Sequence, residues 1–236
     1  AGNVSDASTP FTFTLDTTSP VIKSLAGHSG EAGLATVVLT YDSALDATGL
    51  PNPSAFNVTT GGGNNPVSSI AVEGNVMTLT LQNAFKPGAV SVKYTDPSVS
   101  DDVKAIQDVA GNDAAGFSSG LVADGYVRGA TVYIDINGNG VADIGVDYLV
   151  GTTDDTGNFF MASDAPAGAI IAVGGINIDT GVANTVALKA PEGSSTINPL
   201  TTMVQAVVEQ QVSSGATVDV DMIAAAASTV AASLGL

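Results

Sequence analysis

Short runs of alternating apolar and polar residues, separated by turn residues, fill the first half of the chain and constrain its fold most. One double run surrounds Glu73-Gly74-Asn75, and a corner of this kind suits a tight hairpin. Six or seven short strands at a spacing of about 8–12 residues are typical of a β-sandwich. We therefore predict an Ig-like β-sandwich over residues 20–120, preceded by the end strand or linker of another unit over residues 1–19. The runs lie at residues 11–15, 21–25, 34–41, 55–59, 70–81 and 90–95.

Further strand-like runs follow a segment of small residues. Residues 116–120 resemble a linker or closing turn because they combine glycine with serine. Beyond them, β-branched and aromatic residues predict a second β unit from residue 121 onwards. Its strand-like runs lie at residues 125–127, 130–134, 158–161 and 169–173.

The end of the chain, from residue 198 onwards, changes to a helical period. Apolar residues recur at helical spacing between residues 200 and 212, where Asn198 suits the N-cap and Pro199 the first helical position. A second helix is expected after Asp219 or Asp221. We predict that both helices pack on the preceding sheet, so that residues 121–236 form a second β-sandwich-like domain with two C-terminal helices and the chain is mainly β. The apolar face expected for the second helix consists of Ile223, Ala227, Val230 and Leu234.

The formal charge of −17, from six Lys+Arg against 23 Asp+Glu, limits the partners of this chain. A nucleic-acid-binding surface needs clustered basic residues, so no nucleic-acid partner is expected. No run of 18 apolar residues exists, so membrane insertion is not expected either. Residues 1–6 lack the pattern of a signal peptide, and we expect a segment cut from a longer protein.

The acidity comes almost entirely from aspartate. Of the 23 acidic residues 19 are Asp and four are Glu, and the chain has no cysteine. Aspartate favours turns and oxygen-ligand loops, whereas glutamate favours helices. Calcium is therefore the expected cofactor, and disulfides and cysteine-based zinc sites are excluded.

One loop in the second half has the spacing of a calcium loop. Oxygen-bearing side chains stand at positions 1, 3, 5 and 9, and a glycine stands at position 6, where the loop turns sharply. The backbone carbonyl at position 7 is expected to join them. The expected ligands, in order, are Asp135, Asn137, Asn139, Val141 and Asp143.

The closing position of this loop departs from the pattern. Position 12 is Val146 instead of a bidentate glutamate, and Asp147 follows one residue late. Asp147 can substitute if the loop leaves into a strand. The alternative is a plain Asn-Gly turn whose aspartates are only solvated.

A second acidic group closes the predicted sandwich. The group consists of Asp108, Asn112 and Asp113. Asn112 ends an Ala-Gly-Asn triplet that also occurs at residues 1–3, as in a tandem array. These three side chains are candidate calcium ligands at a domain end, with Asp16 or Asp124 as further donors from neighbouring linkers. The alternative is that they only form the last turn of the sandwich.

No group of residues points to catalysis, so we expect no enzymatic activity. His28, the single histidine, lies in a loop of small residues where a solvent-exposed side chain is expected. The chain has no tryptophan to form a sugar platform, and 61–63 lacks the lysine and helix of a phosphate loop.

Five blocks in order resemble a known repeat. Residues 20–120 resemble the Ig-like domain of a cyanobacterial swimming-motility protein and of giant RTX adhesins of Gram-negative bacteria. Residues 121–236 resemble another adhesin segment, in which Gly-x-Val-x-Gly-Ala-x-Val at 125–132 and the calcium loop lead to residues 152–159 and to a helix beginning at 199–202. The five blocks lie at residues 39–46, 55–58, 74–81, 92–97 and 105–112.

This resemblance implies an extracellular, calcium-rigidified piece of a long bacterial adhesin used in surface attachment and biofilm formation. It assigns calcium to Asp135, Asn137, Asn139 and Asp143. The implied partners are neighbouring domains of the same chain, with cell-surface glycans or peptides bound through adjacent modules, and the expected state is monomeric. The alternatives are a calcium-dependent sugar- or peptide-binding module and an accessory domain of a polysaccharide-active enzyme.

Overall fold

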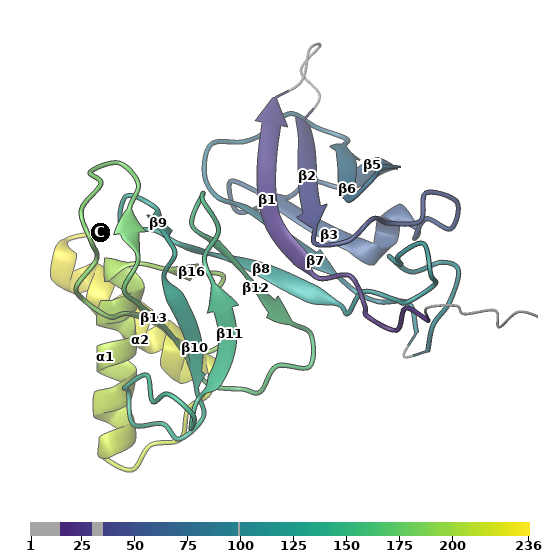
Figure 1. The fold of residues 1–236 in the computed structure, drawn as a ribbon. Coiled ribbons are helices and arrows are strands. Elements are labelled where there is room, and N and C mark those ends of the chain that lie inside the picture. The colour runs from purple at the N-terminus through teal and green to yellow at the C-terminus, as the bar shows by residue number, and fades with distance from the viewer. Residues whose placement is uncertain (1–14, 30–34, 99) are drawn as a thin grey trace, which may run out of the picture.

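The structure is a computed structural model in which residues 15–29, 35–98 and 100–236 are described. It confirms a mainly β fold with β-sandwich character and two C-terminal helices (Figure 1). The strand predicted at residues 11–15 lies outside the described residues except for Leu15.

The N-terminal sandwich consists of two sheets. The first has the strand order β1-β2-β6-β5, and the second has the order β12-β8-β7-β3-β4, with β16 also paired to β8. The first sheet contains β1 (Ile22–Ser29), β2 (Ala35–Tyr41), β5 (Val67–Glu73) and β6 (Val76–Leu81). The second contains β3 (Phe56–Thr60), which follows the 3-10 turn Pro53–Ala55, then β4 (Gly63–Asn64), β7 (Val90–Tyr94), β8 (Phe117–Val122), β12 (Asn158–Ala162) and β16 (Thr196–Ile197).

The alternation in the sequence explains the core of this sandwich. Along β2, every second side chain is buried, and the predicted hairpin pairs β5 with β6 antiparallel around Gly74, whose φ is 61°. Leu39 and Leu79 from one sheet and Val58 from the other are completely buried in one cluster. Burying one face of each sheet in this way is the main stabilising contribution to a sandwich.

The C-terminal unit follows β8 along the chain. Its sheet has the order β11-β10-β13-β15 and faces β12, β8 and β16 across a core that contains Val132, Phe159 and Ile170. The strands of this unit are β9 (Val127–Arg128), β10 (Thr131–Asp135), β11 (Tyr148–Thr152), β13 (Ala169–Val173), β14 (Ile176–Asn177), which pairs with β9, and β15 (Leu188–Ala190).

The two predicted helices are present as α1 (Pro199–Ser213) and α2 (Val220–Leu234). Asn198 caps α1 in a capping box with Thr201, and Asp219 caps α2, as the sequence predicted. The α1 helix contacts β15 and β16, whereas α2 packs on α1. The predicted face of α2 is wrong in part, because Val230 is buried with Ala226 while Ala227 and Leu234 are exposed.

The segment interpreted as a linker is a central strand, so that interpretation is wrong. β8 pairs with β7 of the N-terminal sandwich and with β12 of the C-terminal unit, and one sheet therefore runs through both (Figure 1). Small residues serve this pairing, because a Cβ on Gly120 would lie 2.1 Å from the ring of Phe159. The Ser119 hydroxyl accepts a hydrogen bond of 2.8 Å from the Val92 amide. The predicted boundary at residue 120 falls inside β8.

The turn between β11 and β12 also holds the free edge of β1. The Leu25 amide donates to Asp154 Oδ2 at 3.2 Å, and the Asn158 side-chain amide donates to the Leu25 carbonyl at 3.2 Å. Asp154 Oδ1 accepts from the amides of Thr156 and Asn158, which fixes this turn. Side chains thus satisfy an edge that would otherwise be open to pairing.

Candidate metal centre

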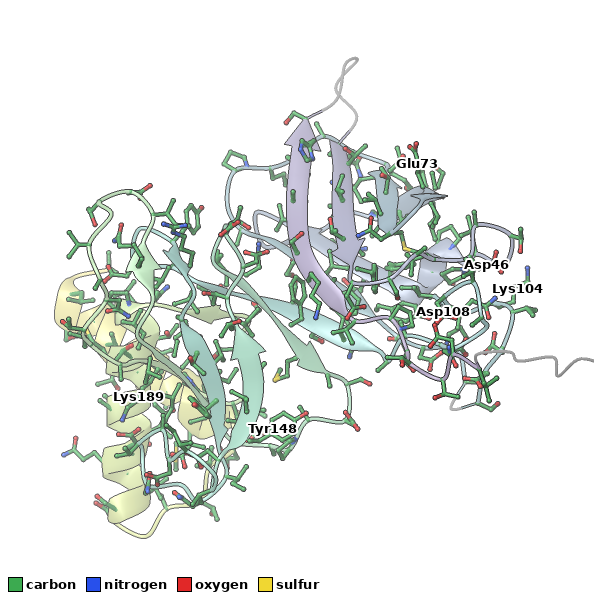
Figure 2. The ribbon with its side chains drawn as sticks, viewed as in Figure 1. Asp46, Glu73, Lys104, Asp108, Tyr148 and Lys189 are labelled. Carbon is green, nitrogen blue, oxygen red and sulfur yellow. The ribbon has the colours of Figure 1, made fainter. Side chains whose placement is uncertain are left out.

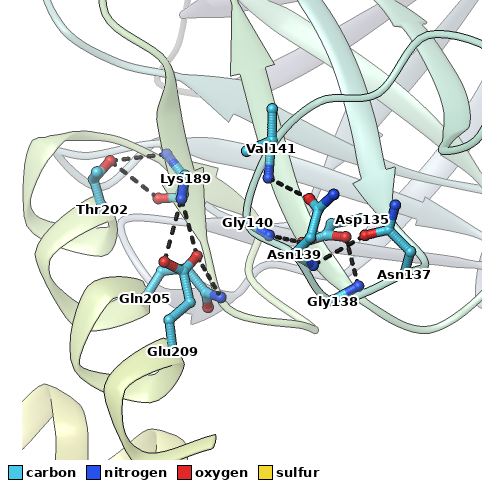
Figure 3. A network of polar contacts seen from close by, with 10 residues as sticks. All are labelled: Asp135, Asn137, Gly138, Asn139, Gly140, Val141, Lys189, Thr202, Gln205 and Glu209. Atoms are coloured by element: carbon cyan, nitrogen blue, oxygen red, sulfur yellow. Dashed lines mark hydrogen bonds and ion pairs between the residues drawn. The ribbon is translucent and has the colours of Figure 1, made fainter. Parts of the chain in front are cut away.

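In the predicted calcium loop, residues 135–147, the side chains point inward because they accept hydrogen bonds from amides of the same loop. Asp135 is 4% exposed, and its two carboxylate oxygens accept from the amides of Gly138 and Gly140, both at 2.7 Å (Figure 3). Asn137 Oδ1 accepts from the Asn139 amide at 3.0 Å, and Asn139 Oδ1 accepts from the Val141 amide at 2.8 Å. Each asparagine side chain thus accepts from the amide two residues later and stabilises a tight turn, which is the local reason for the Asn-x-Asn spacing.

The other two predicted ligands complete a self-contained network. Asp143 Oδ2 accepts from the side-chain amides of Asn137 at 3.2 Å and Asn139 at 2.6 Å. Asp147 is 7% exposed and accepts from the amides of Ile136 and Asp143, so it closes the loop in the place of the missing glutamate. An ion bound here would have to replace these hydrogen bonds by rotating the two asparagine amides.

An ion pair between β15 and helix α1 lies beside the 135–147 loop. Lys189 Nζ lies 3.0 Å from Glu209 Oε1, and Gln205 Nε2 also donates to that oxygen at 3.3 Å (Figure 3). Both charged groups lie beside Gly140, because a Cβ at this glycine would be 3.0 Å from Lys189 Nζ and 2.9 Å from Glu209 Oε1. The glycine at position 6 is therefore required by the helix contact as well as by its φ of 75°.

The second predicted group separates into two environments. Asp108 is 3% exposed and accepts from the amides of Ala110 and Asn112 and from the Asn112 side chain, at 2.8–2.9 Å. Burial opposes its ionisation, but these hydrogen bonds outweigh burial and lower the pKa of Asp108. Asn112 also donates to the Asp16 carbonyl. Asp108 thus forms a closed turn, at the end of the sandwich seen on the right of Figure 2.

Asp113 instead faces two aspartates that the sequence did not single out. Carboxylate oxygens of Asp96, Asp102 and Asp113 all lie within 4.8 Å of one another, and within the described ranges no other set of three carboxylate or histidine side chains converges in this way. We call this group the aspartate triad. Oδ1 of Asp96 and Oδ1 of Asp113 are buried and accept no hydrogen bond from the part of the chain that the structure describes. Buried, unpaired carboxylate oxygens are destabilising unless a cation or donor reaches them.

The electrostatics of the aspartate triad are unfavourable in the absence of a cation. Burial, followed by repulsion from the neighbouring carboxylates, raises the pKa of Asp113, and burial with repulsion from Asp102 raises the pKa of Asp96. The hydroxyl of Tyr94 accepts from the Ile106 amide at 3.0 Å beneath the triad. Burial and the same three carboxylates raise the pKa of Tyr94. Two of the three carboxylates keep a free oxygen, whereas both oxygens of Asp102 accept hydrogen bonds, from the Ser98 hydroxyl and the Lys104 amide. Carboxylate oxygens are the donors that calcium prefers.

The sequence contained only a weak signal for the aspartate triad. Asp96 lies two residues after the end of β7, and Asp102 and Asp113 lie farther along the same loop, which leads to β8. They meet because the loop folds back, with the Asp102 amide donating to Asp113 Oδ2 at 2.8 Å and Gln107 bridged to Asp113. Such a contact depends on the loop path and not on spacing along the chain.

Part of the N-terminal sandwich is similar to a known protein family. Residues 15–99 match the family model described as a putative flagellar system-associated repeat. This part of the chain is thus similar to a motility-associated repeat, in agreement with the resemblance of its sequence blocks. The match ends before Asp102 and Asp113, so it includes only Asp96 of the triad. No curated protein and no solved structure matches the chain.

Two other observations bear on the predicted partners. Within the described residues, no helix has the length and apolar run that would be needed to span a bilayer. His28 is exposed, as the sequence predicted, but the prediction of a loop there is wrong, because His28 lies near the end of strand β1.

Proposed function

We propose that the chain is a non-enzymatic, calcium-stabilised domain pair of a long extracellular bacterial adhesin. It serves as a structural spacer or as a scaffold for ligand-binding modules, in cell-surface attachment and biofilm formation. The observation that carries this proposal is the aspartate triad with its two buried, unpartnered oxygens. The similarity of residues 15–99 to a motility-associated repeat supports a surface role.

Calcium at the aspartate triad would stabilise the connection between the two units. The triad spans the loop from the end of β7 to the start of β8, and β8 is the strand shared by both units. An ion holding Asp96, Asp102 and Asp113 together fixes this loop and removes their mutual repulsion. A chain of such units becomes a stiff rod. Its partners are the neighbouring domains of the same chain, and adjacent modules bind glycans or peptides. The rod itself is monomeric.

The loop at 135–147 is proposed as a second, weaker calcium site. Asp135, Asn137, Asn139, the Val141 carbonyl, Asp143 and Asp147 supply the oxygens. Most of these oxygens already accept hydrogen bonds within the loop, so calcium gains less there than at the triad.

The test is calorimetric unfolding of the 236-residue chain, first with EDTA and then after reloading with calcium, with bound ions counted by titration. At saturating calcium the melting temperature should rise by about 5–10 °C. Asp113→Asn should abolish most of this rise. Asp101→Asn is the matched control, because it removes the same charge from an exposed neighbour outside the triad. An equal calcium response in both variants, or none in the parent chain, would overturn the proposal.

A further inference from the structure

A cleft of about 490 Å³ lies between the two units, beside the turn between β11 and β12 that holds β1. One wall is the start of β1 with Lys23, and the other is β11 with Tyr148 and Thr152. Phe117 of β8 and Phe160 of β12 lie between them, packed edge to face with ring centroids 5.9 Å apart. This volume is in the range of small-ligand sites, and the cleft belongs to neither calcium site.

Hydroxyl groups without protein partners line this cleft. Tyr41 also lines the cleft, but it is only 2% exposed, and its buried hydroxyl, which has no hydrogen-bond partner among the described residues, is closed to a ligand. The hydroxyls of Tyr148 and Thr152 form no hydrogen bond to another described residue. The neighbouring Thr153 differs, because its hydroxyl donates to the Val127 carbonyl at 2.6 Å and accepts from the Ala130 amide. Each free hydroxyl can both donate and accept.

The charged groups of the cleft are already engaged. Lys23 Nζ lies 3.3 Å from Asp42 Oδ2, and Asp42 Oδ1 accepts from the Val21 amide at 2.8 Å. The Asp154 carboxylate accepts hydrogen bonds from the Leu25 amide of β1 and from two amides that follow it in the chain, those of Thr156 and Asn158. No charge is left to pair with an anionic or cationic ligand, and the net charge of −17 further repels anions.

We infer that this cleft binds a neutral saccharide unit. Its hydroxyls are matched by the free hydroxyls of Tyr148 and Thr152, and its C–H faces suit the aromatic faces of Tyr148 and Phe160. Binding would link the two units across their shared sheet. This inference goes beyond the proposed function and does not depend on calcium, since none of the triad residues lines the cleft.

Saturation-transfer NMR on the full 236-residue chain tests the inference. The probes are neutral trisaccharides of glucose, galactose and mannose, with sialyllactose as an anionic probe and a pool of neutral hexapeptides as a third class. Transfer to at least one neutral trisaccharide is expected, with none to sialyllactose. Recording it with calcium and again with EDTA, below the melting temperature, separates this site from the calcium sites.

Variants on one strand locate the binding. Tyr148→Ala should weaken the trisaccharide at least tenfold, and Tyr148→Phe and Thr152→Val about threefold each. Leu149→Ala is the matched control, because Leu149 is 58% exposed on the same strand and does not line the cleft. The inference is overturned if no neutral trisaccharide binds, if only the peptides bind, or if Tyr148→Ala binds as the parent chain does. Loss of binding in EDTA with an intact fold would likewise contradict it.

Discussion

The loop after β10 and the loop after β7 are both rich in aspartate, but only one of them satisfies its own carboxylates. In the 135–147 loop, backbone and asparagine amides reach Asp135, Asp143 and Asp147. In the loop after β7, the three aspartates of the triad face one another and leave two buried oxygens without partners. In the loop with the regular calcium-loop spacing, internal hydrogen bonds satisfy the carboxylates. A bound cation would stabilise the triad more, because its carboxylates come from distant positions in the chain and repel one another.

The largest expected effect is the loss of Asp135. Asp135→Ala leaves two amides of the 135–147 loop without acceptors, at a cost of about 3 kcal/mol. Calorimetry should show a melting temperature lower by roughly 6–12 °C, both with calcium and with EDTA. A loss seen only with calcium would mean that the ion, and not the hydrogen bonds, holds this loop.

The aspartate triad should respond in the opposite way to neutralisation. Asp96→Asn removes one of three repelling charges, so in EDTA the variant should unfold about 2–4 °C above the parent chain. In calcium the order should reverse, because a ligand is missing. A variant less stable than the parent chain under both conditions would contradict the assignment of this group as a cation site.

The dependence of stability on pH should separate Asp113 from Asp108. The folded-state pKa of Asp113 is raised, so its ionisation destabilises the fold, and stability should be regained as the pH falls through that pKa. The pKa of Asp108 is lowered, so its contribution is present above the ordinary carboxyl range, near pH 4, and is lost as the pH falls below that range. We therefore expect the parent chain to gain melting temperature relative to Asp113→Asn as the pH is lowered from 7 to about 4.5 in EDTA. A constant difference over this range would argue against coupling within the triad.

The smallest effect is expected at Asp46. Its carboxylate is exposed and caps a local turn at Thr48, and these hydrogen bonds lower its pKa. Asp46→Ala should change the melting temperature by less than about 2 °C and leave the calcium response intact. A calcium response that depended on Asp46 would show that surface charge as such, and not the two acidic loops, binds the ion.

Local patterns predicted much of the fold. The alternation at 34–41 and 70–81 gave the correct strands and hairpin, because a two-residue period has only one way to bury its apolar face. The caps at Asn198 and Asp219 were predicted for a similar reason, since each side chain bonds an amide three residues ahead. β8 was missed because its glycine and serine residues favour turns locally, and its strand state depends on β7 and β12 on either side.

The sequence by itself determined most strands of the sandwich, the helix caps and the oxygen-rich spacing of the 135–147 loop. All of these leave a pattern in residues a few positions apart, such as an alternation, a cap three residues before an amide, or a regular ligand spacing. Only the tertiary structure decided that Asp113 meets Asp96 and Asp102 instead of Asp108, and that one strand belongs to both units. Those features depend on the path of the loop between β7 and β8. That path is fixed by packing between distant segments, which spacing along the chain does not encode.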